Sequence, residues 1–347
     1  MPLNSLELQS IGKSAIDHYR KNAAVDQINV ERPLLTLLED KAKDLVGGQE
    51  FVVSQIFTNN GASGQNYSGN GRVTYNTRNP TEQAKFRFTN SHDGFTVNED
   101  SLFRSGIQVT DDIGKSLATR GEVVAMGKYM GDRLKALDEG FKEYLNAMVW
   151  LDGTQSVDAI PGVDALVSLT PAVGTVGGIN AATNVYWRNQ AATGIAPTMA
   201  AMLNAMEVMK RNILRTKGRV DRIFAGGDFI DALRNAVLAA NVTQVTYNGG
   251  ASIGIDMATK QMKFDGVAIE YIPDFDNSFG TAPAIPFAKR CYMLDTRYIN
   301  LARSPDDWMK MRYPGRPVDQ YVYFYAITAK YGMEITGRNK QGVLAIA

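Results

Sequence analysis

A continuous apolar stripe near the middle of the chain limits the possible folds more than any other sequence feature. Its members, spaced by three or four residues, are Met126, Met130, Leu134, Leu137, Phe141, Tyr144 and Met148. Because an α-helix turns once in 3.6 residues, this spacing predicts a single helix from Glu122 to Trp150, ~45 Å long. Three glycines within it each weaken a helix by ~1 kcal/mol relative to alanine, so we expect close packing against it.

The segment before this helix, residues 50–112, alternates apolar and polar side chains. The alternating pairs are Phe51 and Val53, Val73 and Tyr75, Phe86 and Phe88, and Phe95 and Val97. A period of two is typical of β-strands, and Ser91-His92-Asp93-Gly94 predicts a turn between the last two. A polar, glycine-rich insertion from Asn59 to Gly71 separates the first two strands. Such a loop has nothing to bury within one chain and tends to be functional or disordered.

The remaining chain mixes helices and strands. Residues 1–49 form an arm of helical spacing that Pro33 interrupts. We expect a methionine-rich helix over 198–216, with Met199, Met202, Met206 and Met209 in the core, and another helix over 229–240. The expected strands are 220–225, 264–272, 291–301 and 321–335. The sequence therefore predicts an α+β fold.

Composition excludes several classes of protein. Lys and Arg total 37 and Asp and Glu 36, so the net charge is +1, which argues against a protein that mainly grips nucleic acid. Cys291 is the single cysteine, and His18 and His92 are the two histidines, which excludes an intrachain disulfide and a three-histidine zinc site. No apolar stretch approaches the ~18 residues of a membrane span, and the first residues do not resemble a secretory signal.

One motif imitates a catalytic one. Gly250-Ala251-Ser252-Ile253-Gly254 matches the nucleophile elbow of serine hydrolases. Those enzymes need a histidine downstream of the serine as the general base, and none follows His92. We therefore interpret the motif as a turn and expect no catalytic, cofactor-binding or metal-binding residues. A cytosolic hydrolase using Ser252 is the alternative from another class.

The order of short segments along nearly the whole chain resembles the major capsid proteins of tailed bacteriophages with the Hong Kong 97 fold. These segments are Glu31-Arg32-Pro33-Leu34-Leu35, Glu50-Phe51-Val52-Val53, Thr81-Glu82-Gln83-Ala84-Lys85-Phe86, Ser91-His92-Asp93-Gly94-Phe95, Asp152-Gly153-Thr154-Gln155, Ile160-Pro161-Gly162-Val163-Asp164-Ala165-Leu166, Asn184-Val185-Tyr186-Trp187-Arg188-Asn189 and Gly342-Val343-Leu344. The bacterial encapsulins share this fold, so an encapsulin-like shell is the alternative within the same architecture.

The resemblance implies four parts: an N-terminal arm (1–49), an extended β-hairpin loop (50–112), a peripheral domain (113–160 and 291–347) with its spine helix over 122–150, and an axial domain (161–290). It implies hexamers and pentamers that close into an icosahedral shell around double-stranded DNA, located in the virion and assembled in the host cytoplasm. Scaffolding, portal and decoration proteins are further partners that it suggests, with weak, non-specific contact to the packaged DNA and no contact with membrane.

The extended loop supplies the candidate contacts between subunits: Lys85, Phe86, Phe88, Phe95 and Val97. Because no helix of residues 50–112 covers either face of its strands, we expect this segment to act between subunits and to stabilise a single subunit little. Some members of the resembled family join a loop lysine to an asparagine of a neighbour. Lys85 is the one lysine between Lys43 and Lys115, yet we expect a non-covalent shell.

Overall fold

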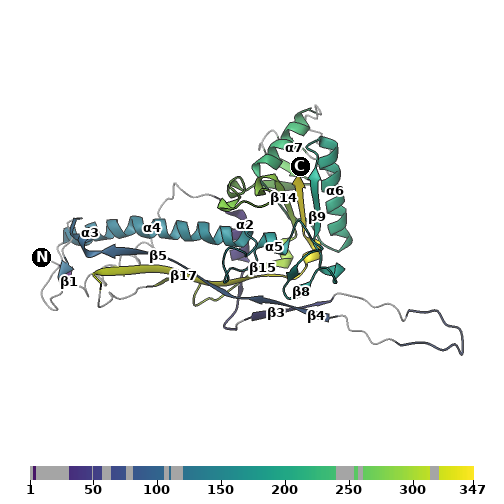
Figure 1. Ribbon diagram of the computed structural model, residues 1–347, viewed down its shortest axis with the longest axis horizontal. Helices are drawn as coiled ribbons and strands as arrows, with labels where there is room; N and C mark the ends of the chain where they lie inside the picture. Colours follow the sequence, from purple (N-terminus) through teal and green to yellow (C-terminus); the bar gives the residue numbers. More distant parts are fainter. Residues whose placement is uncertain are drawn as a thin grey trace.

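The computed structural model sets a long helix along a long β-sheet and a second sheet upright at one end of them (Figure 1). It describes residues 3–4, 31–48, 50–56, 64–75, 81–104, 109–110, 120–239, 254–256, 261–312 and 320–347. The helices are α2 (Pro33–Asp40), α3 (Glu99–Arg104), α4 (Arg120–Trp150), α5 (Val163–Leu166), α6 (Met199–Arg215) and α7 (Gly227–Ala239).

Helix α4 is the helix that the apolar stripe predicts. Met130, Leu134, Leu137 and Phe141 are buried as expected. Beyond Phe141 the buried face passes through Leu145 and Val149, whereas Tyr144 is 44% exposed. Trp150, the last residue of α4, packs against the aromatic rings of Phe224, Phe275 and Tyr292. The C-terminal end of α4 therefore packs against residues of the second sheet. Met126 has a side chain outside the described residues.

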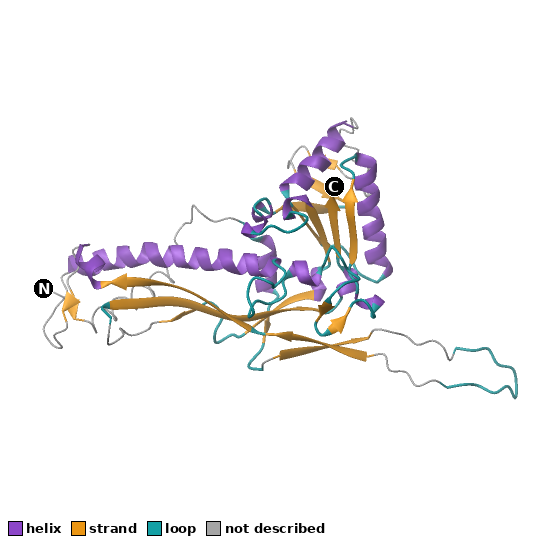
Figure 2. Ribbon diagram, in the orientation of Figure 1, coloured by secondary structure: helices purple, strands orange, loops and turns teal. Residues whose placement is uncertain are grey.

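The long sheet has five strands, and α4 runs along it (Figure 2). The strands are β2 (Lys43–Asp44), β5 (Thr89–Asn98), β15 (Ile299–Arg303), β16 (Lys310–Arg312) and β17 (Val322–Ile335). Strand β17, predicted from its aromatic and β-branched residues, pairs with β5 on one side and with β15 and β16 on the other. Alternate residues of β17, from Tyr323 to Ile335, are buried in the core that includes α4.

The upright sheet has seven strands in the order β11-β12-β13-β10-β14-β18-β9. Their bounds are β11 (Gly254–Asp256), β12 (Gln261–Phe264), β13 (Val267–Tyr271), β10 (Arg222–Ala225), β14 (Arg290–Leu294), β18 (Gly342–Ile346) and β9 (Gln190–Ile195). Helices α6 and α7 cover one face, where Met202, Met206 and Met209 pack against Cys291 and Met293 of β14. The expectation of a methionine-rich core is confirmed. Tyr292 and Leu294, on the other face of β14, belong to the core of the long helix.

Two strands predicted as continuous are each divided. The chain over 291–301 forms β14 of the upright sheet and β15 of the long sheet, because Asp295 and the short 3-10 helix Thr296–Tyr298 redirect it. The chain over 264–272 contains a hairpin turn at Asp265-Gly266, both with positive φ. The expected boundary at residue 291 separates an axial domain from the rest of a peripheral domain. The seven-stranded sheet contains strands from both sides of this boundary, because β14 and β18 belong to it.

Three pairs of strands complete the described part of the chain. They are β1 (Leu3–Asn4) with β6 (Val109–Thr110), β3 (Glu50–Ile56) with β4 (Thr81–Arg87), and β7 (Thr175–Val176) with β8 (Ile179–Asn180). The turn predicted at Ser91–Gly94 is wrong, because these residues lie within β5 and pair with β17. A Cβ atom at Gly94 would stand 2.7 Å from the Tyr325 carbonyl oxygen. Glycine is thus required here by a close strand approach, not by a turn.

Candidate assembly surfaces

The β3–β4 hairpin projects from the molecule, and its base is fixed to the body (Figure 1). The Lys85 N–H donates to the Gly177 carbonyl oxygen at 2.9 Å. The Arg87 guanidinium donates to the carbonyl oxygens of Val157 and Ala159 at 2.6 and 2.8 Å. These bonds join β4 to the chain that follows α4, so the direction in which the hairpin projects is set by the subunit itself.

Three of the five candidate contact residues lie in the subunit's own core or against it. Phe86 is 3% exposed, Val97 is buried, and the Phe95 ring stacks on Tyr325 with centroids 5.4 Å apart. The side chains of Phe86 and Val97 are thus packed within the described subunit and belong to its own core. Val97 is buried because β5 pairs along its length with β17, and the core that includes α4 covers one face of both strands. Phe86, on β4, is buried against Phe51 and Gly177.

The outer part of the hairpin is different. Every residue of 64–75 is exposed, including Tyr67 at 69% and Tyr75 at 90%. The strand predicted around Val73 and Tyr75 is absent from this segment, because within one described chain it has no partner to pair with. Lys85 is exposed and Phe88 half-buried, so these two candidates remain available to a neighbour. In the sequence, Tyr75 stood out only as one member of an alternating pair, and Tyr67 lay within the polar insertion.

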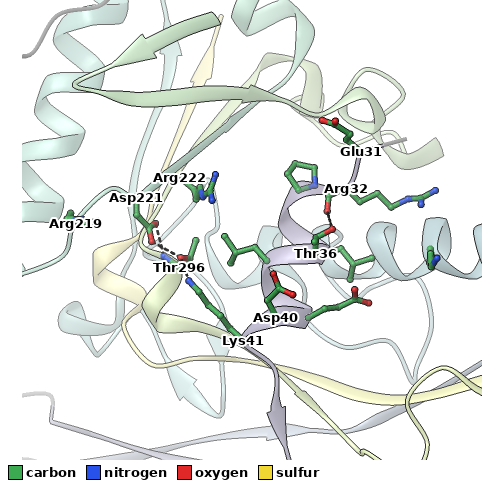
Figure 3. Close-up of a pocket in the computed structure, with 14 residues that line it drawn as sticks. Glu31, Arg32, Thr36, Asp40, Lys41, Arg219, Asp221, Arg222 and Thr296 are labelled. Carbon is green, nitrogen blue, oxygen red and sulfur yellow. Dashed lines mark hydrogen bonds between the residues drawn. The ribbon is translucent and has the colours of Figure 1, made fainter. Parts of the chain in front are cut away.

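A cleft of ≈ 1110 Å³ lies between α2 and the point where the chain crosses from one sheet to the other (Figure 3). Lys41 donates to Thr296 Oγ1 at 2.9 Å, and Asp221 accepts from both the N–H and the hydroxyl of Thr296. Burial raises the pKa of the Glu39 carboxyl above its ordinary value, and the positive charge of nearby Lys142 acts in the opposite direction. The charges are mixed and partly paired, and the lining holds no serine or cysteine. The arrangement fastens α2 to the body of the subunit.

The catalytic alternative rests on Ser252, and the other candidate that the sequence offers is His92. Ser252 lies outside the described residues, and His92 is exposed in the middle of β5. Among the described residues, no group of three or more acidic, histidine or cysteine side chains could hold a metal ion. None of the helices in the same part of the chain is both long and apolar enough to cross a bilayer.

No family model and no curated protein matches the sequence. Solved structures do. The cyanophage A-1(L) capsid superposes with a TM-score of 0.60 and 16% identity, over 93% of this chain and 96% of the other. The chain has the Hong Kong 97-like capsid fold.

Two further capsid structures agree with this assignment. The capsid of the native GTA particle has a TM-score of 0.53 at 13% identity, and that of the empty GTA particle 0.51 at 11%, each over 94% of both chains. The resemblance inferred from the order of sequence segments, and the α+β class, are therefore confirmed for the fold.

Proposed function

We propose that this chain is the major capsid protein of a tailed phage, which assembles as hexamers and pentamers into the icosahedral shell around a double-stranded DNA genome. One observation carries the proposal: the capsid fold extends over 93% of the chain. The exposed hairpin segment 64–75 supports it, because the exposed side chains of Tyr67 and Tyr75 would become buried only against a neighbour.

The anchored base and the exposed tip suit contact between subunits. Hydrogen bonds from Lys85 and Arg87 hold the base, so the orientation of the base need not be fixed when the tip binds. Tyr67 and Tyr75 are the type of residue enriched at the energetic centres of interfaces. In this proposal the tip, with Lys85 and Phe88, contacts the adjacent subunit non-covalently.

The two sheets correspond in this proposal to the two domains of the capsid fold. The seven-stranded sheet with α6 and α7 forms the axial domain near the centre of each ring, and the long sheet with α4 forms the peripheral domain. The net charge of +1 suits a wall that neither binds DNA tightly nor repels it. Scaffolding, portal and decoration proteins are proposed partners, and the protein acts in the virion, after assembly in the host cytoplasm, without enzymatic activity.

Electron microscopy of the expressed full chain tests the proposal. We expect rings or closed shells, and particles from infected cells that contain double-stranded DNA. Closed shells that hold a protein cargo and no DNA would favour the encapsulin-like alternative. A chain that stays monomeric at all concentrations, or an esterase activity lost in Ser252→Ala, would contradict the proposal.

A further inference from the structure

Strand β5 forms one edge of the long sheet, and its register shows which backbone groups face outward. The Glu99 N–H donates to the Tyr321 carbonyl oxygen, in the same register as the β5–β17 pairing. The odd-numbered residues of β5 are therefore the ones that hydrogen-bond to β17. On the other side of β17, the Lys330 N–H donates to the Asp307 carbonyl oxygen, and the Lys330 carbonyl oxygen accepts the Ser304 N–H. Since hydrogen-bonded pairs alternate along antiparallel strands, the even-numbered residues of β5 direct their N–H and C=O groups away from β17.

Among the described strands, β17 alone pairs with β5, so the outward side of β5 is an unpaired edge in the part of the chain that the structure describes. The even-numbered residues of β5 are all exposed: Asn90, His92, Gly94, Thr96 and Asn98. An exposed edge of ten residues is a template on which a strand of another chain can add, and natural proteins block such edges with charged side chains or bulges.

Two charged side chains occupy the centre of this edge. Asp93 Oδ1 accepts the N–H of Gly94 at 2.8 Å. Arg133 of α4 donates from Nη1 to the Thr96 carbonyl oxygen at 3.3 Å. The Asp93 carboxylate also lies beside Gly140 of α4. A donor and an acceptor that an incoming strand would need are therefore already engaged by the subunit's own side chains.

We propose that Asp93 and Arg133 protect the β5 edge against addition of β5 from a second copy of this chain. The sequence itself favours that partner. When two β5 strands pair antiparallel about Gly94, Asn90 faces Asn98 and His92 faces Thr96, so no like charges oppose each other. The ionised Asp93 carboxylate would then lie beside the apolar Phe95 of the second copy, which adds a penalty to the pairing.

Removal of the two side chains provides the test. In dilute full-length protein, we expect the Asp93→Ala/Arg133→Ala variant to dimerise about tenfold more strongly than the wild type, because two backbone groups become free to pair. Sedimentation velocity resolves such dimers from monomers and shells. Asp93→Asn keeps a side-chain oxygen that can accept the Gly94 N–H but removes the negative charge, so it should dimerise more weakly than the Ala/Ala variant and separates the effect of the hydrogen bond from that of the charge.

Disulfide trapping identifies the paired strands. Cys291 is buried, so cysteines introduced as His92→Cys and Thr96→Cys supply the accessible thiols, and facing residues of paired strands lie within disulfide range. We expect cross-linked dimers in the Ala/Ala background and few in the wild type, with Val157→Cys as a measure of random collisions.

Three results would overturn the inference. The first is a folded Ala/Ala variant with the wild-type mass distribution and cross-linking yield. The second is a dimer that does not cross-link through positions 92 and 96, which would place the contact elsewhere. If Asp93→Ala fails to fold, dimerisation is measured for Arg133→Ala alone. The Arg133 guanidinium bonds the Thr96 carbonyl oxygen at an exposed position, so its loss should leave the fold intact. Unchanged dimerisation of that variant is the third.

Discussion

The phenyl rings of Phe51 and Phe86 stack at the base of the β3–β4 hairpin, with centroids 5.8 Å and planes 27° apart. Phe88 packs against the same Phe51 ring at 5.1 Å. Gly177 approaches this cluster so closely that a Cβ atom there would stand 3.0 Å from Ala84 and 3.1 Å from Phe86, and its φ of +60° also favours glycine. The projecting hairpin is thus built outward from a packed aromatic base that belongs to the subunit.

Replacement of Phe86 by alanine should destabilise the isolated subunit. Because the ring is 3% exposed, we expect the free energy of unfolding to fall by ~3–5 kcal/mol, as measured by chemical denaturation. Val52→Ala, on the same hairpin at a side chain that is 50% exposed, is the control and should change stability by less than ~0.5 kcal/mol. Equal effects of the two variants would mean that the hairpin base is not part of the core.

The exposed tip should show the opposite behaviour. Tyr67→Ser/Tyr75→Ser removes two side chains that are 69% and 90% exposed, so the free energy of unfolding should change by less than ~0.5 kcal/mol. Under the proposed function the same variant should assemble poorly, with a lower yield of shells in electron micrographs. Val157→Ser, at an exposed position outside the hairpin, controls for loss of apolar surface in general. Normal shell yield from the tyrosine variant would remove the tip from the contacts between subunits.

The parts of the fold that sequence predicts best are those that a local period determines. Helices α4 and α6 and strand β17 follow from apolar spacing, because each buries one face along its length. The turn at Asp265-Gly266 divides a strand that we expected to be continuous, although Asp-Gly is a strong sequence signal for a two-residue turn.

What sequence spacing does not contain is the tertiary partner. The turn expected at Ser91–Gly94 is wrong because β17, more than 200 residues further along the chain, pairs with these residues. Phe86 is buried because Phe51 and Gly177, the latter about 90 residues further along the chain, lie against its ring. Asp295 redirects the chain between the two sheets through side-chain contacts with the backbone of Arg219 and Arg297. The candidate surfaces share this limit: alternation marks apolar residues, while only the structure separates buried Phe86 from exposed Tyr75.

Denaturing gels of mature particles should show a single band at 38.0 kDa. The reason is that a non-covalent shell separates into its subunits once detergent unfolds them. Lys85 is exposed on β4 and is the loop lysine that could form an isopeptide bond. Lys85→Arg keeps the charge and removes that nucleophile, so the variant should give the same gel. A ladder in the wild type that is absent from Lys85→Arg would establish covalent cross-linking and contradict this expectation.

Acid should weaken the point where the chain passes between the sheets. Burial alone would raise the pKa of Asp295, but hydrogen bonds from Arg297 and from the Arg219 N–H outweigh it and lower that pKa below its ordinary value of 3.8. The stabilisation is therefore complete above about pH 4 and is lost as pH falls through the lower folded-state pKa. Asp295→Asn should cost ~1–3 kcal/mol at pH 7 and flatten this part of the stability–pH profile, measured by urea unfolding. Lys289→Gln is a control at an exposed site. Parallel profiles for the wild type and Asp295→Asn would show that another carboxylate causes the acid sensitivity.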